Sequence, residues 1–316
     1  MLNFAIVGIG WWGQKLINST QGKSKLFRFT EGVSKEPDSV HDFCTKNVIH
    51  LNNDISDVLE NPNVDAVILA TPHSLHVEQI IACANAGKPV FCEKPLALNK
   101  LDAINTISLC QDKNVLLKLG TNKRFWSCMS ELDKAYKTGL IGKLLHIEGH
   151  YSNENTGRHF SEWRTDPKEA PAAGLTGAGL HVLDALIHYA GPVKMLKANV
   201  MSIQPQPNVL DTLTVLFEFD SKVSGTMATI RSTPFYWRIH LFGDNGSLEA
   251  LSENELIIRL KNQDPIKKNF PKVDTLLLEL DEFAVNIAAG KVDQKIYEEM
   301  ISTVDAFEKI VQAVSL

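Results

Sequence analysis

Short runs of β-branched and aromatic residues alternate with amphipathic stretches from the N-terminus to Thr121. This alternation is typical of a parallel sheet whose strands are joined by helices. Asp54, Ser74 and Asn99 stand where helix N-caps are expected, and Gly87 follows the end of an amphipathic segment. The predicted strands cover residues 4–8, 27–34, 64–71, 88–93 and 115–120, with a weaker one over 48–51.

The pattern changes after Thr121. Apolar and polar residues alternate with a period of two over 213–219, 224–230 and 238–244, and short polar connections join these segments. Such a pattern predicts a mostly antiparallel sheet. Segments with helical periodicity stand before it, at LHVLDALIHYAG, and after it, near the end of the chain.

Three glycines, Gly8, Gly10 and Gly13, form the stretch GIGWWG between the first predicted strand and a helix. In this context the glycines make the tight turn, admit a pyrophosphate to the backbone and let the helix meet the strand. The anion would then lie on the helix N-terminus. Together with Trp11 and Trp12 of the same turn, the glycines are the expected dinucleotide-binding residues.

The end of the second predicted strand indicates which dinucleotide binds. Ser34 and Lys35 stand where an acidic residue would otherwise hold the ribose 2′-hydroxyl of NAD(H). A hydroxyl followed by a cation suits a 2′-phosphate better, so NADP(H) is the preferred cofactor. NAD(H) remains the alternative, because Glu31 or Glu36 would supply the acid if the strand ended elsewhere.

Composition excludes several classes of function. The chain has 316 residues and a formal net charge of −5, so it has length for two domains but no basic surface for nucleic acid. Its five cysteines form no CxxC pair, which argues against a disulfide framework or a zinc ribbon. The N-terminal apolar run is too short to cross a membrane and resembles no signal peptide, so we expect a cytoplasmic protein without a membrane partner.

A lysine at the end of a buried strand is the most informative single residue. Lys94 follows the apolar run of residues 89–92 in the stretch FCEKPLAL. Burying an unpaired ammonium group costs several kcal/mol, so the charge is expected to have a use. Parallel sheets bind ligands beyond the carboxyl ends of their strands, and Lys94 lies at such an end.

The stretches GIGWWG, ATPHSLHVEQIIACANAGKPVFCEKPLAL and LTGAGLHVLDALIHYAG together resemble the Gfo/Idh/MocA oxidoreductases over nearly the whole chain. The resemblance implies an α/β fold with two domains. Residues 1–121 would form a Rossmann dinucleotide-binding domain with a parallel sheet. Residues 122–316 would form a substrate-binding and oligomerisation α/β domain with an open, mostly antiparallel sheet. The resemblance also implies reversible hydride transfer between nicotinamide and a secondary alcohol or ketone of a sugar, cyclic polyol or cis-diol.

Residue by residue, the resemblance makes Lys94 the proton donor or electrostatic stabiliser at the reacting oxygen. Glu93 and Pro95 would position it, and the Lys94–Pro95 bond is a candidate for the cis form. The loop that would run beside the nicotinamide carries four further cofactor residues, Thr71, Pro72, His73 and His76. For the two histidines, ordinary polarity at a helix start is the alternative interpretation.

The usual second signature of the family, D-x-G-x-H-x-x-D, is incomplete here, because Gly177 replaces the first aspartate. His181 and Asp184 match the remaining positions and would share one helical face. They are predicted to be catalytic and to bind substrate, with His181 as a proton relay. The alternatives are a core histidine and an aspartate that bonds a neighbouring backbone group. His188 is interpreted as core.

A stretch that includes Trp163, Arg164 and Asp166 resembles a branch of the family similar to phthalate dihydrodiol dehydrogenases. It favours a cis-diol or cyclic polyol substrate, and Arg164 is assigned to the cofactor. Asn122 and Arg124 follow the last parallel strand and are predicted to bind the small-molecule substrate.

The spacing of His146, Glu148 and His150 resembles that of metal-ligating side chains, but the rest of the stretch does not. The surrounding residues alternate as in a strand, so no catalytic metal is predicted. The family implies a homodimer or homotetramer. A non-catalytic dinucleotide-binding regulator is the rival function: Gly177 favours it, whereas Lys94 and His181 argue against it.

Overall fold

The computed structural model describes residues 1–154, 162–172, 174–202, 211–290 and 294–314. The chain forms two compact units, Met1–Asn122 with Asp274–Tyr297, and Lys123–Val273 with Glu298–Leu316. These units differ from the predicted domains of 1–121 and 122–316, because residues 274–297 return to the first unit.

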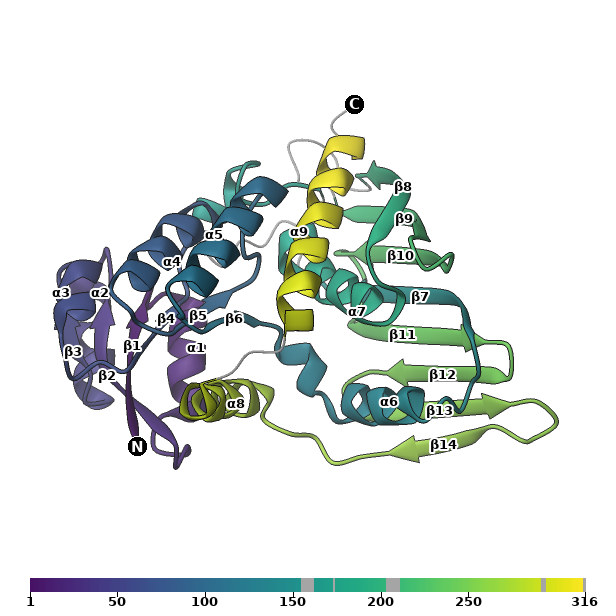
Figure 1. Cartoon of the computed structure of the whole chain (residues 1–316), viewed down its shortest axis with the longest axis horizontal. Coiled ribbons are helices and arrows are strands. Elements are labelled where there is room, and N and C mark those ends of the chain that lie inside the picture. The colour runs from purple at the N-terminus through teal and green to yellow at the C-terminus, as the bar shows by residue number, and fades with distance from the viewer. Residues whose placement is uncertain (155–161, 173, 203–210, 291–293, 315–316) are drawn as a thin grey trace. The chain divides into compact units, whose positions relative to one another are not determined.

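The first unit contains the predicted parallel sheet, with six strands in the order β3-β2-β1-β4-β5-β6 (Figure 1). All five strand pairs are parallel. The prediction is confirmed, although most strands are shorter than their apolar runs. The strands are β1 Leu2–Val7, β2 Phe27–Val33, β3 His50–Asn52, β4 Ala66–Leu69, β5 Val90–Glu93 and β6 Leu117–Gly120.

The helices of the first unit begin where local capping allows. Asp54 accepts a hydrogen bond from the Ser56 backbone, and Asn99 accepts one from the Asp102 backbone, as predicted. The prediction that Ser74 caps a helix was wrong, because a 3₁₀ turn over His73–Leu75 precedes the helix. The helices are α1 Trp11–Thr20, α2 Pro37–Lys46, α3 Ile55–Glu60, α4 His76–Asn85, α5 Lys100–Asp112 and α8 Thr275–Ala289.

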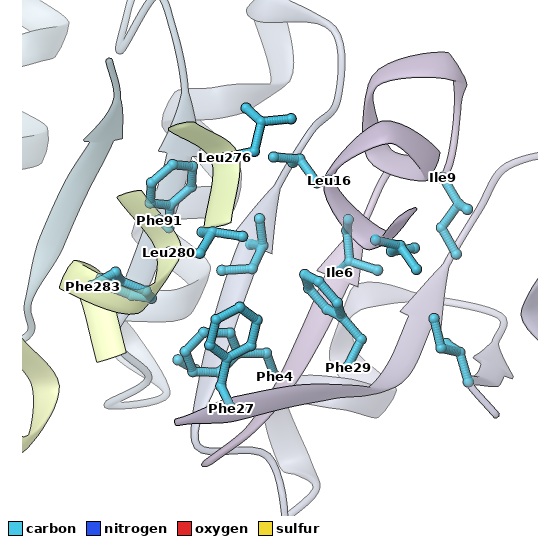
Figure 2. Close-up of a cluster of buried hydrophobic side chains, with 14 of the residues drawn as sticks. Phe4, Ile6, Ile9, Leu16, Phe27, Phe29, Phe91, Leu276, Leu280 and Phe283 are labelled. Carbon is cyan, nitrogen blue, oxygen red and sulfur yellow. The ribbon is translucent and has the colours of Figure 1, made fainter. Parts of the chain in front are cut away.

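Helix α8 completes the core of this unit, as Figure 2 shows. Leu276, Leu280 and Phe283 repeat at helical spacing and pack against the phenylalanines of the sheet. Phe4 stacks on Phe27 with ring centroids 4.5 Å apart and lies 5.6 Å from Phe283. Each fully buried side chain of this kind stabilises the fold by about 1.5–3 kcal/mol, so the unit depends on α8.

The second unit contains eight strands in the order β14-β13-β12-β11-β7-β10-β9-β8. Only β10 and β7 pair in parallel among the described strands, so the sheet is mixed and mostly antiparallel, as predicted. The strands are β7 Leu144–Ser152, β8 Val193–Met201, β9 Thr212–Phe219, β10 Ser224–Ile230, β11 Tyr236–Gly243, β12 Gly246–Leu251, β13 Glu255–Leu260 and β14 Ile266–Asn269. The helices are α6 Ser127–Lys137, α7 Leu180–Ala190 and α9 Gln294–Val314, the last belonging to this unit from Glu298 on.

One face of this sheet is covered by α6 and α7. Gly149 of β7 lies so close to α7 that a β-carbon there would collide with Val182. Because side chains alternate along a strand, His146, Glu148 and His150 point to the opposite face. Within the described residues, no helix is both long and apolar enough to span a bilayer.

Candidate active site

The glycine turn after β1 has the geometry of a phosphate cradle. Gly8 has φ +93°, and a β-carbon on it would lie 2.6 Å from the Ala70 carbonyl oxygen. A β-carbon on Gly13 would collide with the Gly8 carbonyl, whereas one on Gly10 would meet no described atom within 4 Å. The backbone at Gly10 is therefore open to a ligand at the start of α1, and these residues fit a dinucleotide.

Two tryptophans flank this turn at the start of α1. Trp11 is 49% exposed, and the Lys15 ammonium lies 5.4 Å from its ring and 5.0 Å from the ring of Trp12. A cation between two aromatic faces is held by the ring quadrupoles. The turn therefore carries both a positive charge and open backbone.

Strand β2 ends at Val33, so Ser34 and Lys35 follow it directly. The Glu36 backbone donates a hydrogen bond to Ser34 Oγ at 3.2 Å. Glu31 lies within the strand, where its carboxylate accepts a hydrogen bond from Asn52 Nδ2 at 2.8 Å. The strand end is therefore occupied by a hydroxyl and a lysine.

The loop after β4 is tied to the turn after β5 by His76. This side chain is fully buried, with Nδ1 2.7 Å from the Pro95 carbonyl oxygen and Nε2 3.1 Å from the Thr71 carbonyl oxygen. His73 is also buried, and the two rings meet edge to face with centroids 5.8 Å apart. Both rings thus lie inside the unit, next to Pro72, rather than exposed at a helix start.

The turn after β5 carries Lys94. The strand ends at Glu93, Lys94 is partly buried, and the Lys94–Pro95 bond is cis, as the sequence suggested. Glu93 is paired in register with Gly120, and a β-carbon on Gly120 would lie 3.0 Å from the Glu93 carboxyl atoms. The buried Glu93 side chain therefore packs over Gly120, where any residue with a β-carbon would leave it less room.

A second acid lies beside Glu93. Glu279 of α8 is 0% exposed. Burial raises the pKa of its carboxyl group well above the ordinary value, the charge of Glu93 raises it further, and Lys118 opposes both. Lys118 itself forms an ion pair with Glu282. Glu279 was not predicted from the sequence, although its place among the apolar positions of α8 was a signal.

In the second unit, Arg124 binds two acids. Its Nε and Nη2 donate to the two oxygens of Asp184, both at 2.6 Å, and Nη1 donates to Glu299 at 2.7 Å. His188, interpreted as core, lies 3.0 Å from Glu299 and 3.2 Å from Asp133. Neither Glu299 nor Asp133 was predicted, because Glu299 lies 175 positions from Arg124 and Asp133 lies 55 positions from His188.

This network lowers the pKa of two of its carboxyl groups. Burial alone would raise the pKa of Glu299, but the hydrogen bond to His188 and the charge of Arg124 lower it to about 2. The pKa of Asp133 is also lowered, against its burial, by hydrogen bonds to Lys137 and His188. Asp184 is thus oriented by Arg124, and this is the contact that the structure gives its carboxylate.

The remaining predicted residues are placed as follows. His181 is buried on α7, one turn before Asp184, and a π-helical turn over Leu175–Gly179 precedes it. A β-carbon on Gly177 would meet no described atom within 4 Å. In the 3₁₀ turn Glu162–Thr165, the guanidinium of Arg164 lies 4.2 Å from the Trp163 ring. Asn122, in the first unit, donates to Thr275 Oγ1 at 3.1 Å.

Comparison with known proteins identifies the chain. Residues 2–121 match the oxidoreductase family with an NAD-binding Rossmann fold, and residues 129–249 match the C-terminal domain of the same group. The chain belongs to the Gfo/Idh/MocA family. As a member, it is an NAD(P)-dependent oxidoreductase, and its glycine cradle lies within the matched Rossmann segment.

Relatives in the Gfo/Idh/MocA family include inositol dehydrogenases. Myo-inositol 2-dehydrogenase of Thermotoga maritima is 29% identical over 261 residues, which are 75% of this chain and 74% of the relative. The NADP(+)-dependent scyllo-inositol 2-dehydrogenase of Bacillus subtilis is 24% identical over 98% of this chain and 96% of its own length. The structure of levoglucosan dehydrogenase with NADH and levoglucosan has the same fold, with TM-score 0.88, 19% identity, and coverage of 99% and 97% of the two chains.

Proposed function

We propose that the chain is an NADP-preferring dehydrogenase or reductase of a cyclic polyol or sugar, with Lys94 at the reacting oxygen. The observation that carries the proposal is the fixed turn after β5. There Lys94 follows a buried strand, the carbonyl of the next residue is bound by His76, and the preceding side chain is packed on Gly120. A cation held at the carboxyl edge of a Rossmann sheet suits charge that develops on an oxygen.

The chemistry divides between the cofactor and the protein. The nicotinamide, when bound, supplies or accepts the hydride. Lys94 polarises the substrate oxygen and exchanges its proton, and His181 relays that proton onward. Asp184 and Arg124 are proposed to meet substrate hydroxyls as an ion pair of fixed geometry, with Asn122 as a further polar contact.

Ser34 and Lys35 support the preference for NADP(H). They occupy the end of β2, while the nearest acid, Glu31, is engaged by Asn52. In Rossmann folds generally, a basic residue at this place accommodates the 2′-phosphate of NADP(H). A lysine beside a hydroxyl suits the same role. Thr71, Pro72 and Arg164 are proposed as further cofactor contacts, and NAD(H) is the alternative cofactor.

The proposed substrate class rests on the similarity of the chain to its relatives. The inositol dehydrogenases among the relatives act, by their names, on cyclic polyols. A cis-diol of the kind used by dihydrodiol dehydrogenases is the finer alternative that the stretch around Arg164 suggested. Both are secondary alcohols and would use Lys94 in the same way.

The open face of the second unit supports a homodimer or homotetramer. By register, Met195, Met201, Leu216 and Tyr236 share the face of Glu148, and each is more than 40% exposed. Exposed apolar side chains on a broad sheet suit a second copy of the same chain. Light scattering at several protein concentrations would test this. We further propose a cytoplasmic location.

The central experiment separates binding from turnover. NADPH and NADH are titrated by fluorescence, and inositols, anhydrosugars and cis-diols are then screened for a change in nicotinamide absorbance. Lys94→Met is expected to lower turnover by ~10²–10⁴ while dinucleotide affinity is kept. Lys113→Met, an exposed lysine of the same unit, is the matched control.

Each part of the proposal can fail separately. Dinucleotide binding with no turnover on any substrate would favour a non-catalytic regulator, the function that Gly177 suggests. Turnover that survives Lys94→Met would overturn the mechanism. Tighter binding of NADH than of NADPH would overturn the preference drawn from Ser34 and Lys35.

A further inference from the structure

Lys15 is a cation at the dinucleotide turn that the proposed function does not use. It lies on α1 one turn after Trp11, and its ammonium group lies 5.4 Å from the ring of Trp11 and 5.0 Å from the ring of Trp12. The two rings are tilted against each other, with centroids 5.5 Å apart. Because side chains on a helix point towards its N-terminus, this exposed lysine reaches back over the first turn of α1.

No acid balances this charge. Helix α1 contains no acidic residue, and within the described parts of the chain Lys15 forms no ion pair. The N-terminus of a helix carries about +0.5 of an elementary charge from its backbone dipoles. A lysine held over that end adds a like charge, which is unfavourable unless an anion binds there.

The backbone beside Lys15 suits such an anion. Gly10 is the N-cap residue of α1, and among the described residues no side chain caps the helix there. A β-carbon on Gly10 would meet no described atom within 4 Å, so a ligand can approach the first N–H groups of the helix. The chain belongs to a family with an NAD-binding Rossmann fold, and such folds bind the pyrophosphate of the dinucleotide at this helix N-terminus.

We propose that Lys15 is a dinucleotide-binding residue: Trp11 and Trp12 hold its ammonium group over the first turn of α1, where it pairs with the pyrophosphate of NADH or NADPH. A cation–π contact holds the cation without cancelling its charge, as an ion pair would, so the charge stays available to an anion. Because both dinucleotides contain the pyrophosphate, Lys15 raises the affinity for both equally, unlike the residues at the end of β2. The inference uses the dinucleotide binding of the family and does not depend on the proposed role of Lys94.

The contact with the pyrophosphate is tested by calorimetric titration. NADH, NADPH and ADP-ribose, which keeps the pyrophosphate but lacks nicotinamide, are titrated into wild type, Lys15→Met and Lys15→Arg. Lys15→Met should lower the affinity for all three ligands by the same factor, roughly 10-fold, the loss expected for one hydrogen bond to a charged group. Lys15→Arg keeps the cation and should keep most of the affinity. Lys25→Met is the matched control, because this exposed lysine follows the other end of α1.

The contribution of charge is tested by salt. Salt screens the attraction between an exposed ammonium group and a phosphate. The ratio of wild-type affinity to Lys15→Met affinity should therefore shrink as ionic strength rises from ~0.02 M to ~0.5 M. The corresponding ratio for Lys25→Met should vary much less. A ratio for Lys15→Met that ignores salt would contradict a pairing of charges.

The role of the tryptophans is tested by a double-mutant cycle. Trp11→Leu removes one ring and should by itself weaken the binding of ADP-ribose. In the Lys15→Met background the same change should cost less affinity, because no ammonium group is left to hold. Additive losses would show that Trp11 acts apart from Lys15 and would overturn its part in the proposal.

A measurement on the wild type alone covers the case in which a variant does not fold. Lysine acetylation by acetic anhydride, followed by peptide mass spectrometry, compares the chain with and without ADP-ribose. Lys15 should be labelled several-fold more slowly when ADP-ribose is bound, whereas the exposed Lys25 and Lys113 should be labelled at an unchanged rate. Equal labelling of Lys15 in both states would contradict its contact with the pyrophosphate.

The titrations have further outcomes that decide the proposal. A loss of affinity for NADPH alone would place Lys15 at the 2′-phosphate and overturn the pyrophosphate contact. The same loss in Lys25→Met would show only a long-range effect of charge, and an unchanged affinity of Lys15→Met would overturn the proposal outright. A wild-type chain that binds dinucleotides but turns over no substrate contradicts the proposed function, whereas the titrations still decide the role of Lys15.

Discussion

The pKa of a buried carboxyl group is shifted in opposite directions in the two units. In the second unit, Arg124 meets Asp184 and Glu299 with three hydrogen bonds of 2.6–2.7 Å, and the pKa of Glu299 falls to about 2. In the first unit, burial raises the pKa of Glu279 well above its ordinary value, the charge of Glu93 raises it further, and the charge of Lys118 opposes both. The pKa values of buried acids thus shift in opposite directions, because hydrogen bonds and the charge of Arg124 outweigh burial at Glu299, whereas burial dominates at Glu279.

The difference also separates two uses of a buried acid. An ionised pair fixes direction, since a guanidinium and a carboxylate meet in a planar, two-pronged geometry. A carboxyl group whose pKa is raised by burial becomes costly to bury as pH rises towards that pKa. We therefore expect the Arg124 cluster to respond to acid and the Glu93 cluster to respond to base.

The largest expected effect comes from removing the cation of the second unit. Arg124→Met leaves Asp184 and Glu299 buried without their counter-charge and should lower the free energy of unfolding by about 3–5 kcal/mol. Urea denaturation measures it. As the control, Lys134→Met breaks an exposed ion pair with Glu131 and should lower the free energy of unfolding by less than ~1 kcal/mol. Equal destabilisation by the two variants would show that the buried Arg124 network stabilises the fold no more than an exposed ion pair does.

Removing one acid of the same network should have a smaller, pH-dependent effect. The folded pKa of Glu299, about 2, lies below its ordinary value of 4.5, so its stabilisation is present above pH 4.5 and lost as pH falls through about 2. Glu299→Gln should therefore lose about 3 kcal/mol at pH 6 and approach wild type at lower pH. Denaturant midpoints at pH 6 and pH 3 test this, and a constant gap would refute it.

In the first unit, the close contact at Gly120 can be tested directly. Gly120→Ala places a β-carbon 3.0 Å from the Glu93 carboxyl group and should cost about 1–2 kcal/mol through overpacking. Gly177→Ala is the control, because no described atom lies within 4 Å of its β-carbon. Thermal unfolding compares them, and the same destabilisation in both would show that Glu93 does not occupy this space.

The smallest effect is expected at the half-exposed partner of Lys118. Glu282→Gln removes an ion pair whose acid is 50% exposed, so stability should change by less than ~1 kcal/mol. The informative quantity is the variation of Tm with pH. Removing the charge of Glu282 leaves the charge of Lys118 less opposed near Glu279, which lowers the folded pKa of Glu279, so the loss of stability with rising pH should be complete at a lower pH than in wild type. An unchanged profile would show that Lys118 does not control Glu279.

Local patterns predicted much of this molecule. The parallel sheet, the caps at Asp54 and Asn99, the glycine cradle and the place of Lys94 all depend on residues close together in sequence. What the sequence did not reveal depends on contacts between distant segments. The charge of Glu93 acts on Glu279 from a distant part of the chain, and Glu299 reaches Arg124 over 175 positions. No spacing rule links such residues, because only the tertiary fold brings them together.

The return of α8 to the first unit has a consequence for how the protein is made. The side chains Leu276, Leu280 and Phe283 complete the core around Phe4, yet they are synthesised after the whole 123–273 segment. The nucleotide-binding unit therefore cannot close its core until residues 274–297 have left the ribosome, although domains generally fold in order of synthesis. A nascent chain that stops after residue 122 would present its phenylalanine cluster to chaperones.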